Sequence, residues 1–176
     1  MQPRSARGSV NGLFDLGDWK GCCYMDLADG KVYLRIVKEE DIDLLFSWAN
    51  DPEVRKNAFH TESIPYEAHQ KWFAKLLQDN TRLQYIFMVD DEPAGQIRFS
   101  LAEDKAVIDY SIAPKMRGRG YGKIMLNLAH EEICKNHPSI RTLIGQVKSG
   151  NQASEKCFAA CGYEESFKQF ELKCKE

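Results

Sequence analysis

The feature that most restricts the fold is the stretch of residues 108–128, which reads IDYSIAPKMRGRGYGKIMLNL. Apolar residues alternate up to Ile112, as in a half-buried strand, and they recur at helical spacing from Tyr121 onward. Between these two patterns lies RGRGYG, at residues 117–122. The sequence therefore predicts a strand, a glycine-rich turn and a helix, in that order.

This order predicts a site for an anion. A helix N-terminus offers unpaired backbone N–H groups and the positive end of the helix dipole. Glycines without a Cβ let a ligand approach that backbone. Four cations also lie within nine residues of an otherwise acidic chain: Lys115, Arg117, Arg119 and Lys123. We expect a pyrophosphate here, and the alternative is a turn that merely caps a surface helix.

The spacing of the glycines excludes two common phosphate loops. The string G-x-x-x-x-G-K-[ST] is absent, and Gly118, Gly120 and Gly122 do not give the interval G-x-G-x-x-G. R-x-x-G-x-G does fit, and residues 151–163 (NQASEKCFAACGY) fit N-x-x-[AS]-x-x-x-[YF]-x-x-x-G-[FY]. With both motifs, the chain resembles the GNAT superfamily of acyl-CoA-dependent N-acyltransferases.

Length and composition favour one globular domain. The chain has 176 residues, of which 43% are apolar, and its net charge is −2. We therefore expect no nucleic-acid partner. No apolar run is long enough to span a membrane and no signal peptide is readable, so we expect no membrane partner and a cytoplasmic location. The six cysteines show no zinc-type spacing, which predicts reduced thiols and no metal.

Periodicity divides the chain at about residue 31. Residues 1–31 show no sustained period, and we expect an N-terminal appendage, a linker or an added tail, or a segment that packs late on the core. Residues 32–176 predict the order β-α-α-β-β-β-α-β-α-β. The predicted strands lie at about residues 32–37, 84–89, 96–101, 106–112, 141–148 and 166–173 and the helices at about 38–48, 65–77, 119–135 and 152–161, with a loop or short irregular helix at residues 55–64. This is an α/β (α+β) fold with a mixed sheet and helices on both faces. The final strand could pair across the two-fold axis of a homodimer.

The resemblance implies a mostly antiparallel sheet in which two strands splay apart and hold acyl-CoA. Acetyl-CoA is then the co-substrate. The cofactor-binding residues that the resemblance implies are Ile112, Ala113, Arg117, Gly118, Arg119, Gly120, Tyr121, Gly122, Lys123, Asn151, Ser154 and Phe158. Asn151 and Ser154 have an ordinary alternative, since Asn is a good N-cap and Ser suits the first helical turn.

Acetyl transfer to an amine needs a neutral amine, a stabilised oxyanion and a proton for the departing thiolate. We expect the Ile112 N–H to polarise the oxyanion. Many family members place a glutamate and a tyrosine where this chain has Gln146 and Phe158, and neither of these side chains titrates. Asp109, Tyr110, His60, Glu62 and His69 remain as candidate acids or bases, although a solvated loop position is the alternative for His60 and packing beside Trp72 is the alternative for His69. An amine of low pKa would need positioning alone.

Residues 48–59 (WANDPEVRKNAF) resemble the N-terminal half of GNAT enzymes that acetylate nucleotide-activated amino sugars, of the pseudaminic acid type. The acceptor would be a small-molecule amine. We expect Arg55 to meet a diphosphate, Asn57 to bond hydroxyls, Phe59 to stack and His69 to line the site. Trp48 and Trp72 lie on apolar helix faces, which favours the core.

Three other functions stay open. One is acetylation of protein N-termini, as in ribosomal-protein acetyltransferases, although Gln146 and Phe158 count against it. Another is a non-catalytic CoA-binding domain, which the same two residues suggest. The third is detoxification of arylamines or antibiotics, which no residue supports specifically.

Overall fold

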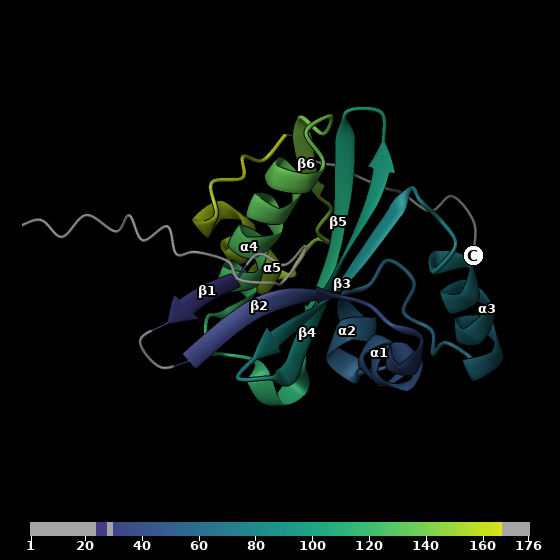
Figure 1. The fold of residues 1–176 in the computed structure, drawn as a ribbon. Coiled ribbons are helices and arrows are strands. Elements are labelled where there is room, and N and C mark those ends of the chain that lie inside the picture. Colours follow the sequence, from purple (N-terminus) through teal and green to yellow (C-terminus); the bar gives the residue numbers. More distant parts are fainter. Residues whose placement is uncertain (1–23, 28–29, 167–176) are drawn as a thin grey trace, which may run out of the picture.

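The computed structural model describes residues 24–27 and 30–166, which form one six-stranded sheet with helices on both faces (Figure 1). The strands are β1 (Tyr24–Leu27), β2 (Gly30–Ile36), β3 (Arg82–Val89), β4 (Glu92–Ala102), β5 (Lys105–Ile112) and β6 (Thr142–Gly145). The helices are α1 (Ile42–Ala49), α2 (Pro52–Asn57), α3 (Tyr66–Leu76), α4 (Tyr121–Asn136) and α5 (Gln152–Ala160), with short 3-10 turns η1 (Glu39–Asp41) and η2 (Pro114–Met116). None of the described helices is long and apolar enough to cross a lipid bilayer.

The strands follow one another across the sheet in chain order. Every neighbouring pair from β1 to β5 is antiparallel, and only β5 and β6 run parallel. A mixed, mostly antiparallel sheet with helices on both faces is therefore confirmed. The strand predicted at residues 166–173 lies, apart from Ser166, outside the described residues.

The sheet begins inside the segment that was expected to be an appendage. β1 pairs with β2 from Tyr24↔Tyr33 to Leu27↔Gly30. A four-residue strand is too short to show a clear period of two, which is why the sequence pattern did not reveal it. Residues 1–23 and 28–29 lie outside the described part of the chain.

The side chains of the central strands feed two hydrophobic cores, one on each face of the sheet. On β3, Tyr85, Phe87 and Val89 belong to the core under α4, while Ile86 and Met88 belong to the core under α1 and α3. This alternation follows from the two-residue period of a strand. Figure 1 shows α4 and α5 on one side of the sheet and α1, α2 and α3 on the other.

β5 and β6 separate after four residue pairs. Their pairing runs from Lys105↔Thr142 to Ile108↔Gly145, and β5 then continues to Ile112 without a β6 partner in the described chain. β6 was expected to extend to residue 148, but it ends at Gly145. The Phe158 ring packs against this glycine, where an added Cβ would lie 2.4 Å from its Cζ. The predicted splayed strand pair is thus present.

We predict that Gly145→Ala destabilises the fold by about 1–3 kcal/mol, because the added methyl group overlaps a ring that cannot easily move. Phe158 lies edge to face between the rings of Tyr110 and Tyr163, at centroid distances of 5.6 and 4.9 Å. Urea unfolding measures the loss. In a Phe158→Leu background the same substitution should cost less, and an equal cost in both backgrounds would show that the close approach of the ring is not the cause.

Arg35 of β2 fixes the start of α1 through Asp41. Its two terminal nitrogens donate to the two carboxylate oxygens, each at 2.7 Å, and the Lys38 N–H donates to Oδ2 at 2.8 Å. Burial by itself would raise the pKa of Asp41, but these donors outweigh it and bring the pKa below the ordinary value of 3.8. The ionised carboxylate is therefore the form that the fold stabilises.

Stability from Asp41 should therefore be fully present above pH 3.8 and be lost as the pH falls through the lowered folded-state pKa. We predict that Asp41→Asn lowers the free energy of unfolding at about pH 7, and that its difference from the wild type shrinks at about pH 2.5. Urea unfolding at both pH values checks this. Asp104→Asn, at an exposed turn, is the control, and a difference at Asp41 that stays constant with pH would contradict the prediction.

Candidate active site

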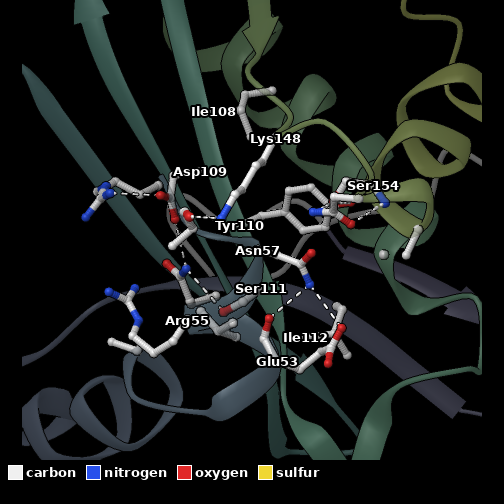
Figure 2. A pocket seen from close by; sticks show the side chains of 18 of the residues that line it. Glu53, Arg55, Asn57, Ile108, Asp109, Tyr110, Ser111, Ile112, Lys148 and Ser154 are labelled. Atoms are coloured by element: carbon white, nitrogen blue, oxygen red, sulfur yellow. Dashed lines mark hydrogen bonds and ion pairs between the residues drawn. The ribbon is translucent and has the colours of Figure 1, made fainter. Parts of the chain in front are cut away.

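A cavity of about 990 Å³ lies where β5 and β6 separate (Figure 2). Residues from both faces of the sheet line it. On one side these are residues 53–59 with His69 and Trp72, and on the other side the glycine loop and residues 150–154 with Phe158. The end of β5 and the chain that follows β6 thus open onto one continuous cleft.

The glycine loop presents its backbone to this cleft. Gly118 and Gly120 have φ of 76° and 79°, which residues other than glycine rarely adopt, and apart from their chain neighbours no atom of the described residues lies within 4 Å of where their Cβ atoms would be. Gly120 is also the N-cap of α4 and brings no side-chain acceptor to the amides of the first turn. Amide groups at an uncapped helix start suit an anion.

Gly122 also serves the packing of two helices. A Cβ at this position would lie 3.0 Å from the Cys157 Sγ, so Gly122 lets α4 pack closely on α5. Gly122 lines the cleft as well, and its part in cofactor binding stays a prediction.

Arg117 does not point into the cleft as a free cation. Its Nη2 donates to Asp51 Oδ1 at 2.5 Å and its Nε donates to the carbonyl oxygen of Ile112 at 3.1 Å. The predicted role as a phosphate ligand does not fit this geometry, because Asp51 already balances the charge. Arg119 and Lys123 are exposed, and Arg119 has only a 3.9 Å contact with the Met116 sulfur.

The end of β5 directs one amide toward the gap. The Ala113 N–H donates to the Ala94 carbonyl and the Ala113 carbonyl accepts from the Met116 N–H, both at 2.9 Å. Ala113 thus has both main-chain groups engaged, contrary to its predicted part in cofactor binding. Backbone directions alternate along an extended strand, so the Ile112 N–H points away from β4, toward the side that β6 leaves open.

The far wall is the start of α5. Asn151 caps this helix, with its Oδ1 accepting the Ser154 N–H and its Nδ2 donating to the Ser154 Oγ, both at 3.2 Å. The ordinary N-cap arrangement is therefore present, and both residues also line the cleft. Phe158 is only 7% exposed and belongs mainly to the core.

Tyr110 crosses from β5 to this wall. Its hydroxyl donates to the Ser154 Oγ at 3.3 Å, and burial raises its pKa above the ordinary value of 10.0. Figure 2 shows Tyr110 and Asp109 pointing to opposite sides of β5. The phenol therefore stays protonated near neutral pH.

Asp109 is part of a polar row on the face of the sheet that α3 covers. Its carboxylate accepts from Arg98 Nη2 at 3.1 Å and from Gln96 Nε2 at 3.3 Å, and Gln96 also donates to Ser111 Oγ at 3.3 Å. The Arg98 guanidinium lies 5.3 Å from the centre of the Trp72 ring. The side chain of Asp109 remains 58% exposed, so a ligand can reach it.

Gln96, Arg98 and Ser111 were missed by sequence analysis. Their signal was the polar half of the alternation on β4 and β5; on β4 every second residue from 96 to 100 lines the cleft, and on β5 residues 107–112 all do. Polar residues at these positions usually indicate a solvent-exposed face, so only the structure reveals that the face lines a cavity.

The predicted acceptor residues lie on or beside α2, where a loop or short irregular helix was expected. Arg55, Asn57 and Phe59 all line the cleft. Arg55 Nη1 donates to the His60 carbonyl at 3.2 Å, and within the described chain no carboxylate lies within ion-pair distance of it. Asn57 bonds back to the Glu53 carbonyl at 2.9 Å, and Phe59 is 66% exposed at the rim.

The two predicted histidines differ in position, since His69 is among the residues that line the cleft and His60 is not. His69 is 2% exposed, contacts the Ile42 carbonyl oxygen through Nε2 at 2.9 Å and packs 5.3 Å from the Trp72 ring. Burial lowers its pKa, so it is a neutral residue of the core between α1 and α3. His60, proposed as a catalytic group, is exposed and is not one of the residues that line the cleft. Trp48 is buried, as expected.

The segment after β6 completes the cleft. Gln146 is exposed there, and Lys148 Nζ donates to the carbonyls of Lys56 and Ala58 at 3.0 and 3.2 Å. Among the residues that the structure describes, no three His, Cys, Asp or Glu side chains are arranged to hold a metal ion.

The chain is similar to several known proteins. It is 26% identical over 125 residues to the acetyltransferase PseH of Campylobacter jejuni subsp. jejuni serotype O:23/36 (strain 81-176), a match that covers 69% of this chain and 76% of that protein. Spermidine N-acetyltransferase from Vibrio cholerae, solved with CoA and spermine, shares the fold with a TM-score of 0.69 at 16% identity, covering 77% and 82% of the two chains.

A third similar protein is RimL, the ribosomal L7/L12 alpha-N-protein acetyltransferase, solved with CoA. Its TM-score is 0.66 at 17% identity, and the match covers 78% of this chain and 82% of that one. Residues 31–164 match the family model described as the acetyltransferase (GNAT) domain. This match spans the sheet from β2 to β6, the glycine loop and α5, and the chain therefore belongs to the GNAT acetyltransferase family.

Proposed function

We propose that this acetyltransferase moves the acetyl group of acetyl-CoA to the primary amine of a nucleotide-activated amino sugar. The observation that carries the proposal is the single cavity that joins the open glycine loop to the polar face beside α2 and α3. Two substrates that must react need one continuous space, and the unpaired end of β5 lies at its centre.

The proposed binding of the cofactor depends on main-chain groups. The amides at the start of α4 would hold the pyrophosphate of acetyl-CoA, since Gly118 and Gly120 leave open space above the backbone. Arg119 and Lys123 are the exposed cations near this loop. CoA is present in the V. cholerae and RimL structures, which supports the choice of cofactor.

The part of the cleft beside α2 and α3, where the acceptor would bind, suits a ligand that carries both negative charge and hydroxyl groups. Arg55 is a cation without a carboxylate partner in the described chain, and the exposed Phe59 ring can stack on a base or sugar face. Gln96 and Ser111 offer hydrogen bonds on the facing wall. The resemblance of residues 48–59 to enzymes of the pseudaminic acid type and the match to PseH support the same acceptor class.

The reaction follows from these positions. Asp109 would accept a proton from the acceptor ammonium, directly or through a water molecule, and the neutral nitrogen would then attack the thioester carbonyl carbon. The Ile112 N–H would stabilise the oxyanion of the tetrahedral intermediate. The nitrogen of this intermediate loses its second proton to water, and collapse then breaks the C–S bond and releases the CoA thiolate. The group that protonates this thiolate is in turn reprotonated from water.

The thiolate needs a proton, and Tyr110 is the candidate donor. Phe158 cannot supply one, because a phenyl ring does not titrate. Tyr110 is a protonated phenol with a raised pKa, it lines the cleft, and its hydroxyl lies beside Ser154 at the start of α5. This assignment leaves Gln146 without a role in proton transfer.

We expect release of CoA thiol from acetyl-CoA when UDP-amino sugars are supplied, with weaker turnover of free amino sugars that lack the nucleotide. Gly120→Glu is the control, because it introduces a side chain at positive φ and a negative charge into the anion site, and it should abolish turnover. Turnover of N-terminal peptides alone would support the ribosomal-protein type instead. Acetyl-CoA binding without any turnover would indicate a non-catalytic domain.

We also predict that Asp109→Asn lowers kcat by about 10²-fold or more, since an amide cannot accept the proton. Acetyl-CoA affinity, measured by calorimetry, should stay unchanged because Asp109 faces the acceptor side of β5. Asp104→Asn is the matched control at the exposed turn before β5. A kcat equal to that of the wild type would remove Asp109 from the mechanism and favour catalysis by positioning alone.

A further inference from the structure

α2 forms one wall of the cleft, although nothing in its own sequence fixes it there. It has six residues, none of which is buried. A helix this short is unstable by itself, because nucleation costs more than a few hydrogen bonds recover. Residues 53–58 nevertheless line the cavity. Contacts from outside the helix must therefore hold it in place.

The N-terminal end of α2 is fastened to β5. The N-cap Asp51 accepts the Val54 N–H at 3.1 Å and the Arg117 Nη2 at 2.5 Å, both through Oδ1. Arg117 in turn donates through Nε to the Ile112 carbonyl at 3.1 Å. The side chains of Arg117 and Asp51 are only 32% and 13% exposed, so water screens this pair less than a pair at an open surface.

The C-terminal end of α2 is fastened to the chain that follows β6. Lys148 Nζ donates to the carbonyls of Lys56 and Ala58, at 3.0 and 3.2 Å. Carbonyl groups at the end of a helix lack partners within the helix and carry the negative end of its dipole, which favours a cation there. Figure 2 shows the Lys148 side chain extending into the cleft.

We propose that α2 is a strap between the separated ends of β5 and β6, fastened by Arg117 at one end and Lys148 at the other, and that both cations position the acceptor wall. Beyond Ile108 and Gly145 the two strands no longer pair, so α2 bridges the part of the sheet where backbone bonds are missing. Arg55 and Asn57 lie on this strap, and its position sets theirs.

The state of Asp51 agrees with this role. Burial alone would raise its pKa, but the bonds from Arg117 and from the Val54 N–H outweigh burial and lower it. The carboxylate is thus ionised and matched to Arg117. A phosphate at Arg117 would have to displace this partner, whereas the open amides of the glycine loop need no such exchange.

The first test distinguishes an effect on the position of α2 from an effect on cofactor binding. Its kinetic measurements with the acceptor rest on the proposed function. Asp51→Asn keeps an N-cap but loses the ion pair, and Arg117→Gln loses it from the other side. Each variant should lower kcat/KM for the acceptor by about 10- to 100-fold through misplacement of α2. The double variant should be little worse than either single one, because both remove the same contact.

In the same variants acetyl-CoA affinity, measured by calorimetry, should change by no more than about 2-fold. Lys135→Gln is the matched control, since Lys135 is an exposed cation in the last turn of α4 and is not one of the residues that line the cleft. If Arg117→Gln weakens acetyl-CoA binding strongly while Asp51→Asn does not, Arg117 is a phosphate ligand and the proposal fails.

The second test needs no substrate, so it stands even if the acceptor assignment fails. Hydrogen exchange of the α2 amides should become faster in Lys148→Met and in Asp51→Asn, with exchange in β3 and β4 unchanged. Lys148→Arg, which can still donate to both carbonyls, should retain more of the protection. Lys156→Met, on the exposed side of α5, is the control. Unchanged exchange in α2 of Lys148→Met would overturn the strap.

Discussion

The structure of the site depends on the early separation of β5 and β6. Their parallel pairing ends at Ile108↔Gly145, while β5 continues to Ile112. A strand with one unpaired side exposes backbone donors and acceptors that must find partners elsewhere. In this protein the unpaired side faces a cavity, so the missing pairing becomes the place where ligands can bind.

Close packing maintains this separation from the α5 side of the sheet. The Phe158 ring lies against Gly145 with no space for a Cβ, and Gly122 lets α4 approach Cys157 of α5. Tyr110 crosses to Ser154 and forms a polar link between β5 and α5. On the opposite side of the sheet, electrostatic contacts maintain the separation, since Arg117 and Lys148 hold the two ends of α2.

The two faces of β5 carry side chains with different chemical properties. Tyr110 points to the side of α4 and α5, where burial keeps the phenol protonated, and Asp109 points to the side of α3, where Arg98 and Gln96 orient its carboxylate. The two-residue period of a strand thus places the proton donor and the proton acceptor that we propose next to each other in sequence but on opposite faces of the sheet. The Ile112 amide lies further along the same strand, at the end of β5.

Much of this could be predicted from local sequence. The period of apolar residues located β2 to β5, α1, α3, α4 and α5, because each is long enough to show its pattern. The glycine spacing located the turn at the start of α4. The sequence did not predict β1, because a strand of four residues gives little periodic signal. It also did not predict the early end of β6, because the aromatic ring that limits this strand comes from a later helix.

The sequence by itself determined the order of the elements, the glycine loop and the acetyltransferase family, because these depend on spacings within short segments. Only the tertiary structure decided which side chains meet. Arg117 reads as a phosphate ligand until Asp51, from a distant segment, lies 2.5 Å away. Lys148 was not singled out at all, because its partners are main-chain carbonyls about 90 residues earlier. Such contacts join segments whose proximity no local pattern encodes.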